Sequence, residues 1–181
     1  MPLTEMLLAE FDDEMAKTRK LLACLPDEIS NWRPHPKSME MNRLAGHVAE
    51  LPMWATHTVK LEQLDITPQP GQNFEALVAR SREKLLQAFD HNVAEARQAI
   101  SGINDDHLSK TWTLIFKGKP IMQMPRAAIL RGMVMNHLIH HRAQLGVYLR
   151  LNEVPIPGMY GASADEPSIF RGETAAEKKS A

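Results

Sequence analysis

Residues 133–151 read MVMNHLIHHRAQLGVYLRL, and this segment indicates most clearly what kind of fold the chain adopts. Its apolar residues recur at helical spacing without a proline, so it predicts a long amphipathic helix. We expect the helix to begin at Pro125, a residue favoured at the first helical position, and to end near Leu151. Within it, His137 and His141 lie four residues apart and therefore project from one face, one turn apart.

Three other segments share this periodicity. We expect helices at Leu3–Leu25 with Thr4 as its cap, at Met39–Leu64 with Ser38 or Asn42 as its cap and Pro52 inside it, and at Phe74–Ile100 with Gly102 as its end. Together the four helices predict an all-α four-helix bundle. The connection before the last long helix is long, and WTLIFKGKPIMQM within it favours a hairpin around Lys117–Gly118 or an extended loop.

A single domain is expected over residues 1–170 of the 181-residue chain. The segment NEVPIPGMYGASADEP after the last helix is too irregular for a helix or a central strand, so we place it on the bundle surface. Residues 171–181 are polar and are expected to form a flexible tail.

Composition excludes several classes of protein. The 21 basic and 22 acidic residues give a net charge of −1, so the chain lacks the basic excess typical of a nucleic-acid partner. Cys24 is the only cysteine, which excludes an intramolecular disulfide and a cysteine-built zinc site. No apolar run approaches the ~20 residues of a membrane span, and the N-terminus is acidic where a signal peptide would be basic. We therefore expect a cytoplasmic protein with no membrane partner.

Three histidines point into the interior of the predicted bundle. On a helical wheel His141 lies about 40° from His137, on the same stripe as the apolar residues of its helix. His47 lies at the centre of the apolar stripe of the second helix, between Leu44 and Leu51. Two helices thus direct three imidazoles toward one interior.

Two interpretations of these histidines are open. A single buried histidine is usually a hydrogen-bonded core residue. Three buried histidines are different, because each has two ring nitrogens that need hydrogen-bond partners and apolar neighbours supply none. One divalent cation would satisfy one nitrogen of each ring. Three nitrogen ligands without cysteine leave a coordination position for water or a thiolate, which is typical of catalytic sites.

Other residues near the histidines are weaker candidates. Glu50 and Gln144 are candidates for hydrogen bonds to the ligand rings, and Glu50 also for a base, although helix solvation is the alternative for each. Leu138 stands where the zincin pattern H-E-x-x-H needs its glutamate, so that pattern is excluded. No Glu-x-x-His occurs anywhere in the chain, which argues against a ferritin-like di-iron centre.

Five further side chains are interpreted from their positions on the helical wheels. Trp54 and Tyr148 share the ligand faces, so they line a pocket or pack in the core. Arg142 points away from the site, toward a salt bridge or a dimer contact. Leu138 and Leu149 lie on that side as well and predict a second buried surface, against another helix or a partner subunit.

At these residues the chain resembles the DinB-like family of four-helix-bundle metal proteins. The resemblance rests on RLAGHVAELPMW (Arg43–Trp54) and on MVMNHLIHHRAQLGVYLRLNEVPIPGMYGASADE (Met133–Glu166). It implies a metal triad at His47, His137 and His141, a nickel or zinc ion, and a homodimer. Some relatives are thiol S-transferases that use bacillithiol or mycothiol, a related branch isomerises maleylpyruvate with mycothiol, and many are labelled only as metal-dependent hydrolases.

The sequence and the resemblance lead to one functional hypothesis and one alternative. The hypothesis is a metal-dependent enzyme, a thiol S-transferase or a hydrolase, that uses the three-histidine site and, for thiol transfer, a low-molecular-weight thiol. The alternative is a non-catalytic dimeric bundle in which the metal stabilises the helices and the protein binds or senses a small molecule. The substrate stays open in both.

Overall fold

A computed structural model describes residues 1–68 and 76–167 of the chain. The helices are α1 (Leu3–Leu22), α2 (Met41–Lys60), α3 (Arg82–Ser101), α4 (Asp105–Ser109), α5 (Arg126–Ile129) and α6 (His137–Leu151), and a π-helical segment, η1 (Leu130–Asn136), joins α5 to α6. The strands are β1 (Gln63–Asp65), β2 (Thr111–Phe116) and β3 (Lys119–Pro125). Over these residues no helix is long and apolar enough to cross a bilayer.

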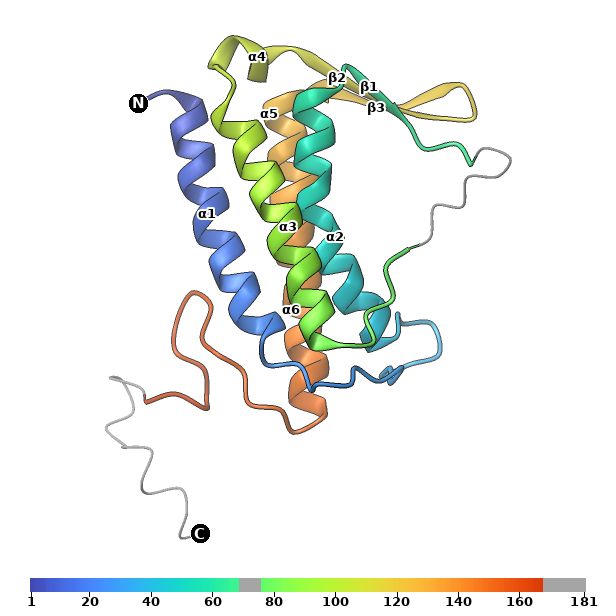
Figure 1. The fold of residues 1–181 in the computed structure, drawn as a ribbon, viewed down its shortest axis with the longest axis vertical. Coiled ribbons are helices and arrows are strands. Elements are labelled where there is room, and N and C mark those ends of the chain that lie inside the picture. Colours follow the sequence, from blue (N-terminus) through green and yellow to red (C-terminus); the bar gives the residue numbers. More distant parts are fainter. Residues whose placement is uncertain (69–75, 168–181) are drawn as a thin grey trace, which may run out of the picture.

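The predicted four-helix bundle is confirmed (Figure 1). Its four long helices are α1, α2, α3 and the continuous helix α5–η1–α6. The small sheet covers one end of the bundle. The chain enters α2 and α3 at the same end, because both starts bond to the loop after α1: the Met41 amide donates to the Trp32 carbonyl and the Arg82 amide to the Asp27 carbonyl. The helices α2 and α3 therefore run parallel, and α1 and α6 run the other way.

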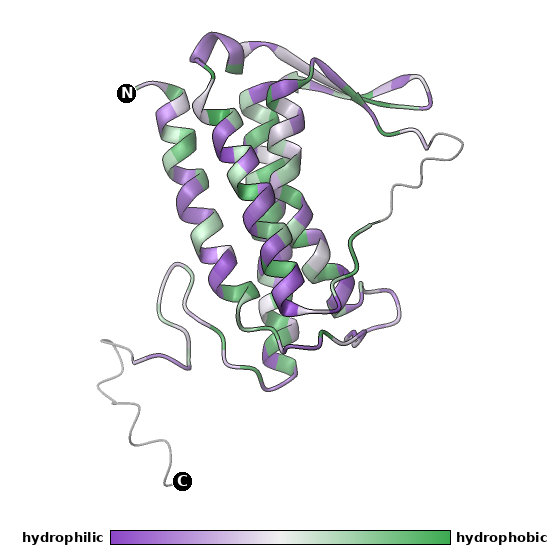
Figure 2. Ribbon diagram, viewed as in Figure 1, coloured by the Kyte–Doolittle hydropathy of each residue, from purple (hydrophilic) through white to green (hydrophobic). Residues whose placement is uncertain are grey.

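The core lies between these helices, whose apolar faces turn inward (Figure 2). Each helix is amphipathic, and burying one stripe against the other three is what stabilises the bundle. A second, smaller cluster lies between the sheet and α5, centred on Trp112, Leu114 and Ile129. Trp54 packs against both clusters and connects the bundle core to the sheet.

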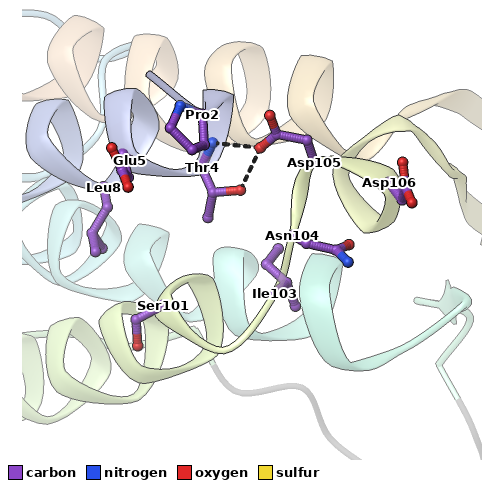
Figure 3. Close-up of a pocket in the computed structure, with 9 residues that line it drawn as sticks. All are labelled: Pro2, Thr4, Glu5, Leu8, Ser101, Ile103, Asn104, Asp105 and Asp106. Atoms are coloured by element: carbon purple, nitrogen blue, oxygen red, sulfur yellow. Dashed lines mark hydrogen bonds between the residues drawn. The ribbon is translucent and has the colours of Figure 1, made fainter.

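The start of α1 differs from the prediction. Thr4 lies inside the helix rather than at its cap, and the Asp105 carboxylate of α4 takes the capping role (Figure 3). It accepts hydrogen bonds of 2.9 Å from the amides of Leu3 and Thr4 and one of 2.7 Å from the Thr4 hydroxyl. A carboxylate satisfies these amides and complements the helix dipole. The hollow around it, of about 530 Å³, lies at the end of the bundle where α1 begins.

Both ends of α2 also differ from the prediction. Neither Ser38 nor Asn42 caps it; Glu40 is the N-cap residue, and carbonyls of the proline-rich loop before it accept its first amides. The helix ends at Lys60 rather than at Leu64. There the buried Arg126 guanidinium donates to the carbonyls of Thr58 at 2.9 Å and Leu61 at 3.0 Å, which caps the helix with a positive charge.

The predicted start of α3 is wrong for the residues that the structure describes. Phe74 lies outside them, and residues 76–80 are extended, so the helix begins only after Ser81, whose hydroxyl accepts from the Lys84 amide. The backbone of this segment bonds to other elements instead of to itself. The Ala79 amide donates to the Asn42 carbonyl, and the Arg80 carbonyl accepts from the Ile29 amide.

A three-stranded sheet of order β1–β2–β3 occupies the connection before the last long helix. The antiparallel pair β2–β3 is the hairpin that the sequence left as one of two alternatives, and Lys117 and Gly118 at its turn both have positive φ, as a type I′ turn requires. The parallel pairing of β1 with β2 differs from the prediction, which places Gln63 and Leu64 in the preceding helix.

The last long helix runs from Arg126 to Leu151, and Pro125 precedes it as the N-cap residue rather than opening it. Residues 152–167 form neither helix nor strand and lie against the bundle, as the prediction of an irregular C-terminal segment required. The predicted tail, residues 171–181, lies outside the described residues.

Candidate metal centre

The three predicted ligands come together where α2 packs against α6. His47 lies in the first half of α2, and His137 and His141 are the first and fifth residues of α6. One ring nitrogen of each lies within 4.8 Å of the others, and these three form the group that could hold a metal ion among the described residues.

The nitrogens that face one another are Nε2 atoms. His137 Nε2 lies 2.9 Å from Nε2 of His141 and 3.4 Å from Nε2 of His47. The ring centroids are 4.6–5.1 Å apart, with tilted or edge-on planes, so the imidazoles surround a point rather than stack. This is the arrangement that three ligands of one ion adopt.

The outer nitrogens, Nδ1, have different surroundings. His141 Nδ1 is 2.8 Å from the Gln144 amide oxygen, and His47 Nδ1 is 3.8 Å from the Glu50 carboxylate. The Gln144 oxygen accepts a hydrogen bond from His141 Nδ1, and the negative charge of Glu50, which lies beyond hydrogen-bond distance, favours a proton on His47 Nδ1. Both neighbours therefore leave Nε2 with a free lone pair. His137 Nδ1 is buried and makes no hydrogen bond of regular geometry, although a backbone hydrogen bond with Met133 contributes to the pKa of this ring.

The π-helical segment η1 sets the angle at which α6 presents its ligands. Three of its residues, Leu130, Val134 and Met135, are buried. The wider turns of a π-helix shift the faces of the preceding residues relative to α6, and such segments occur frequently at functional sites.

Burial makes the ligand rings hard to protonate. The pKa of His141 is lowered to about 4, chiefly by burial and further by the neighbouring His47 and His137 rings, while the hydrogen bond with Gln144 opposes the shift. Burial and then the His47 ring also lower the pKa of His137, while a backbone hydrogen bond with Met133 opposes the shift. Neutral imidazole is the form that binds a metal, so these rings are in their ligand form at neutral pH.

Glu50 is ionised beside the cluster. Burial alone would raise its pKa, but the nearby His47 ring, the hydrogen bond from the Leu77 amide and the charge of Arg43 outweigh burial and hold the pKa below its usual value. A negative charge at this position compensates part of the charge that a cation would bring.

The residues fit a divalent ion. His137 Nε2 can share a proton with only one of its two neighbours, so the protein alone leaves lone pairs facing each other in a largely buried site. A cation would accept all three lone pairs at once. Imidazole nitrogens without thiolate suit zinc, nickel, copper or iron, and three ligands leave a position open.

Two aromatic candidates pack in the core rather than beside the ligands. The Tyr148 hydroxyl donates to the Met39 carbonyl at 3.2 Å, and its ring meets Trp32 edge-on at 5.5 Å. Trp54 is partly buried between the two apolar clusters. The packing alternative for these residues is therefore confirmed.

The far side of α6 is buried within the chain itself. Leu138 and Leu149 are fully buried, so the interpretation of a second surface covered by another helix is the one that holds. Arg142 forms a buried salt bridge of 2.8 Å with Glu14 of α1. The interpretation of a salt bridge, rather than a dimer contact, is thus confirmed for Arg142.

Glu50 has two partners that the sequence did not predict. Arg43 Nη1 lies 3.1 Å from the carboxylate, and the Leu77 amide donates to it. Arg43 and Glu50 are seven residues apart in one helix, hence on one face, and this spacing was a usable signal. The role of Leu77 had no signal, because it depends on the backbone of an extended segment.

Comparisons with known proteins agree with this fold. A sequence model of the DinB family matches residues 1–175. The chain is 27% identical over 164 residues to the uncharacterized protein YrdA of Bacillus subtilis (strain 168), covering 90% of this chain and 91% of YrdA.

Two solved structures share the architecture. A DinB-like protein from Bacillus cereus ATCC 10987 matches with a TM-score of 0.64 and 22% identity, over 86% of this chain and 97% of that one. The DinB-like protein YjoA from Bacillus subtilis matches with a TM-score of 0.61 and 17% identity, over 85% and 97%. At these identities the likeness supports the fold, while the site rests on the residues described above.

Proposed function

This chain belongs to the DinB family, and from its histidine cluster we propose that it is a metalloenzyme that binds one divalent transition-metal ion at His47, His137 and His141. The observation that carries the proposal is the convergence of three Nε2 atoms with no hydrogen-bond arrangement that satisfies them all. We propose zinc or nickel as the ion, because both accept neutral imidazole ligands.

The residues of the site have separable tasks. The three rings bind the ion, and Gln144 and Glu50 orient two of them through Nδ1. When bound, such an ion supplies Lewis acidity that lowers the pKa of a thiol or a water molecule at its open position. The apolar core behind the rings limits access of water from that side.

Of the two reactions, thiol S-transfer has more support than hydrolysis. Hydrolysis benefits from a free general base near the attacking water. The nearby carboxylate, Glu50, is already engaged with Arg43 and the Leu77 amide, so it is poorly placed for that task. A thiol ionises more easily than water and needs less help from a base. We therefore propose a low-molecular-weight thiol as the co-substrate.

The proposal includes a cytoplasmic homodimer. Val147 and Leu151, on the outer side of α6, are 58% and 56% exposed, and burying apolar side chains of this size against a second copy would be favourable. Sedimentation velocity of the full chain is the measurement, with a mass of two chains as the expected result and a single-chain mass as the contrary one.

Metal analysis of protein purified without a polyhistidine tag tests the metal site. We expect about one zinc or nickel ion per chain. The variant His137→Ala should lose it, while His91→Ala, at an exposed position on α3, should keep it. Absence of stoichiometric metal from the wild type, or equal metal content in His137→Ala, would reject the proposal.

Turnover assays separate the enzyme from the non-catalytic alternative. The metal-loaded protein is offered a low-molecular-weight thiol with an electrophilic acceptor and, separately, an ester. Metal-dependent loss of the thiol supports S-transfer, and ester cleavage supports hydrolysis. A protein whose melting temperature falls on chelation, but which turns over neither, would be the metal-stabilised binding bundle.

A further inference from the structure

We infer that Glu50 is a positioning residue that couples the metal site to the extended segment before α3, so that metal binding and the seating of residues 77–79 on α2 strengthen each other. This inference rests on the proposed function, because it concerns the ion held by His47 and its partners. It adds a residue role and a coupling that the three ligands alone do not imply.

The Glu50 carboxylate connects three parts of the molecule. One oxygen accepts the Leu77 amide hydrogen. The other accepts from Arg43 Nη1 at 3.1 Å and lies 3.8 Å from His47 Nδ1. The side chain is only 16% exposed, so water competes weakly for these contacts. One carboxylate thus faces a ligand ring and holds the backbone of a distant segment.

The segment is seated on α2 through its backbone as well. Arg43 Nη1 donates to the Leu77 carbonyl at 3.3 Å, and the Ala79 amide donates to the Asn42 carbonyl at 3.0 Å. Gly46 allows this approach, because a Cβ at that position would lie 1.9 Å from the Leu77 carbonyl oxygen. The residue directly before His47 is therefore the one over which the segment passes.

Gln144 is a second residue that contacts a ligand ring, and it provides a comparison for Glu50. It stands three residues after His141, as Glu50 stands three residues after His47, and its amide oxygen contacts Nδ1 of that ring. Its side chain is neutral and solvent-exposed, whereas Glu50 is charged, largely buried and bonded to a second element. The same spacing therefore gives one local partner and one that reaches across the fold.

Coupling of this kind is reciprocal. If the ion draws the His47 ring into a fixed orientation, the Glu50 carboxylate is fixed with it and holds the Leu77 amide more firmly. Conversely, any change that unseats residues 77–79 frees the carboxylate and loosens the ring. Metal affinity and protection of the Leu77 amide should therefore change together.

The first experiment compares metal affinity in Glu50→Gln and wild-type protein, with Co²⁺ as the probe. Glutamine keeps an oxygen for the Leu77 amide but removes the charge that faces His47 and Arg43. We expect binding weaker by about 10–100-fold and a changed visible absorption spectrum of bound Co²⁺. Glu95→Gln is the matched control, because Glu95 pairs with Lys60 on the exposed surface of α3. Equal affinity and an unchanged spectrum in Glu50→Gln would overturn the inference.

The second experiment leaves both His47 and Glu50 in place. Gly46→Ala pushes the Leu77 carbonyl off α2, while alanine is itself favourable within a helix. We expect Co²⁺ affinity to fall at least several-fold. In the wild type, Co²⁺ should slow hydrogen exchange of the Leu77 and Ala79 amides, and Gly46→Ala should abolish that slowing. This variant tests the coupling even if Glu50→Gln fails to fold.

The outcomes separate this inference from the proposed function. Wild-type protein that binds no Co²⁺ overturns both. Wild-type protein that binds Co²⁺, with unchanged affinity in Gly46→Ala and no metal effect on exchange of the Leu77 amide, leaves the metal site standing and shows that Glu50 does not couple it to the segment.

Discussion

The two sides of α6 carry buried polar groups of opposite kinds. Toward α1, Arg142 donates to the Glu14 carboxylate, the Glu14 carbonyl, the Thr18 hydroxyl and the Tyr160 hydroxyl, at 2.8–3.2 Å. Toward α2, the Nε2 atoms of three histidines face one another, and no arrangement of protons satisfies all three. One cluster satisfies its own hydrogen bonds, whereas the other does not.

The difference separates a structural cluster from a binding site. A buried ion pair is tolerated when its remaining donors and acceptors are all satisfied, as at Arg142. Unsatisfied groups in a native interior call for an explanation, and the ability to bind a cation is the simplest one for three converging imidazoles. The polar cluster around Arg142, between α6 and α1, should therefore stabilise the fold without metal. The histidines between α6 and α2 should stabilise it only when metal is bound.

The largest effect is expected from removing the buried salt bridge between Arg142 of α6 and Glu14 of α1. Arg142→Met leaves the buried Glu14 carboxylate with only the more distant Lys17 ammonium, at 3.7 Å, so the free energy of unfolding of the metal-free protein should fall by about 3–5 kcal/mol. Urea unfolding followed by circular dichroism measures it. The double variant Glu14→Leu/Arg142→Met should recover most of the loss, since no unpaired charge then remains. A loss below about 1 kcal/mol in Arg142→Met would contradict the assignment.

The α2 side should contribute stability through its ligand. At a free metal concentration about a thousand times the dissociation constant, bound Zn²⁺ should add about 4 kcal/mol to the free energy of unfolding. His137→Ala should abolish this gain and cost less than about 1 kcal/mol in the metal-free protein, because the removed ring is incompletely hydrogen-bonded. Urea titrations with Zn²⁺ or with chelator measure both. A large loss without metal would make the histidines a structural cluster like the one around Arg142.

The histidines on the α2 side of α6 should also make the free energy of unfolding depend on pH. An unfolded histidine protonates near pH 6.5, whereas His141 in the folded chain protonates only near pH 4, and the pKa of His137 is shifted in the same direction. Between these values the unfolded chain holds more protons. The free energy of unfolding of metal-free protein should therefore decrease as the pH falls from about 6.5 to about 4, by an amount on the order of 2 kcal/mol.

Denaturant titrations across this pH range, with chelator present, measure the slope. His141→Ala should flatten it, whereas His91→Ala, exposed on α3, should leave it unchanged. Stability that stays constant or rises on acidification would contradict the lowered pKa values. With metal present the fall should be steeper, because protons and the ion compete for the same nitrogens.

The features that could be predicted from the sequence are those that the spacing of apolar residues determines. The positions of His47, His137 and His141 on apolar stripes were enough to place them in one interior, and the helices themselves followed from the same pattern. Regular spacing could not reveal η1. A π-helical turn depends on packing around it rather than on a local motif.

What could not be predicted depends on long-range contacts of the backbone. Asp105 caps α1 from about a hundred residues away, and Arg126 caps α2, so local cap residues such as Thr4 were misassigned. The extended residues before α3 have helical composition, yet their amides and carbonyls bond to α2 and to Ile29. Tertiary hydrogen bonds override local propensity at such positions.

The smallest effect is expected from removing the Gln144 side chain. Its amide accepts from His141 at 2.8 Å, but the side chain is exposed, so water can replace the amide when Gln144→Ala removes it. The free energy of unfolding without metal should change by less than about 0.5 kcal/mol. Zn²⁺ affinity, measured by calorimetry against a competing chelator, should fall by less than about tenfold, at the weak end of effects from such partners. A loss of a hundredfold would mean that the His141 ring depends on this amide as completely as Arg142 depends on Glu14, and the contrast between the two sides of α6 would then be one of degree.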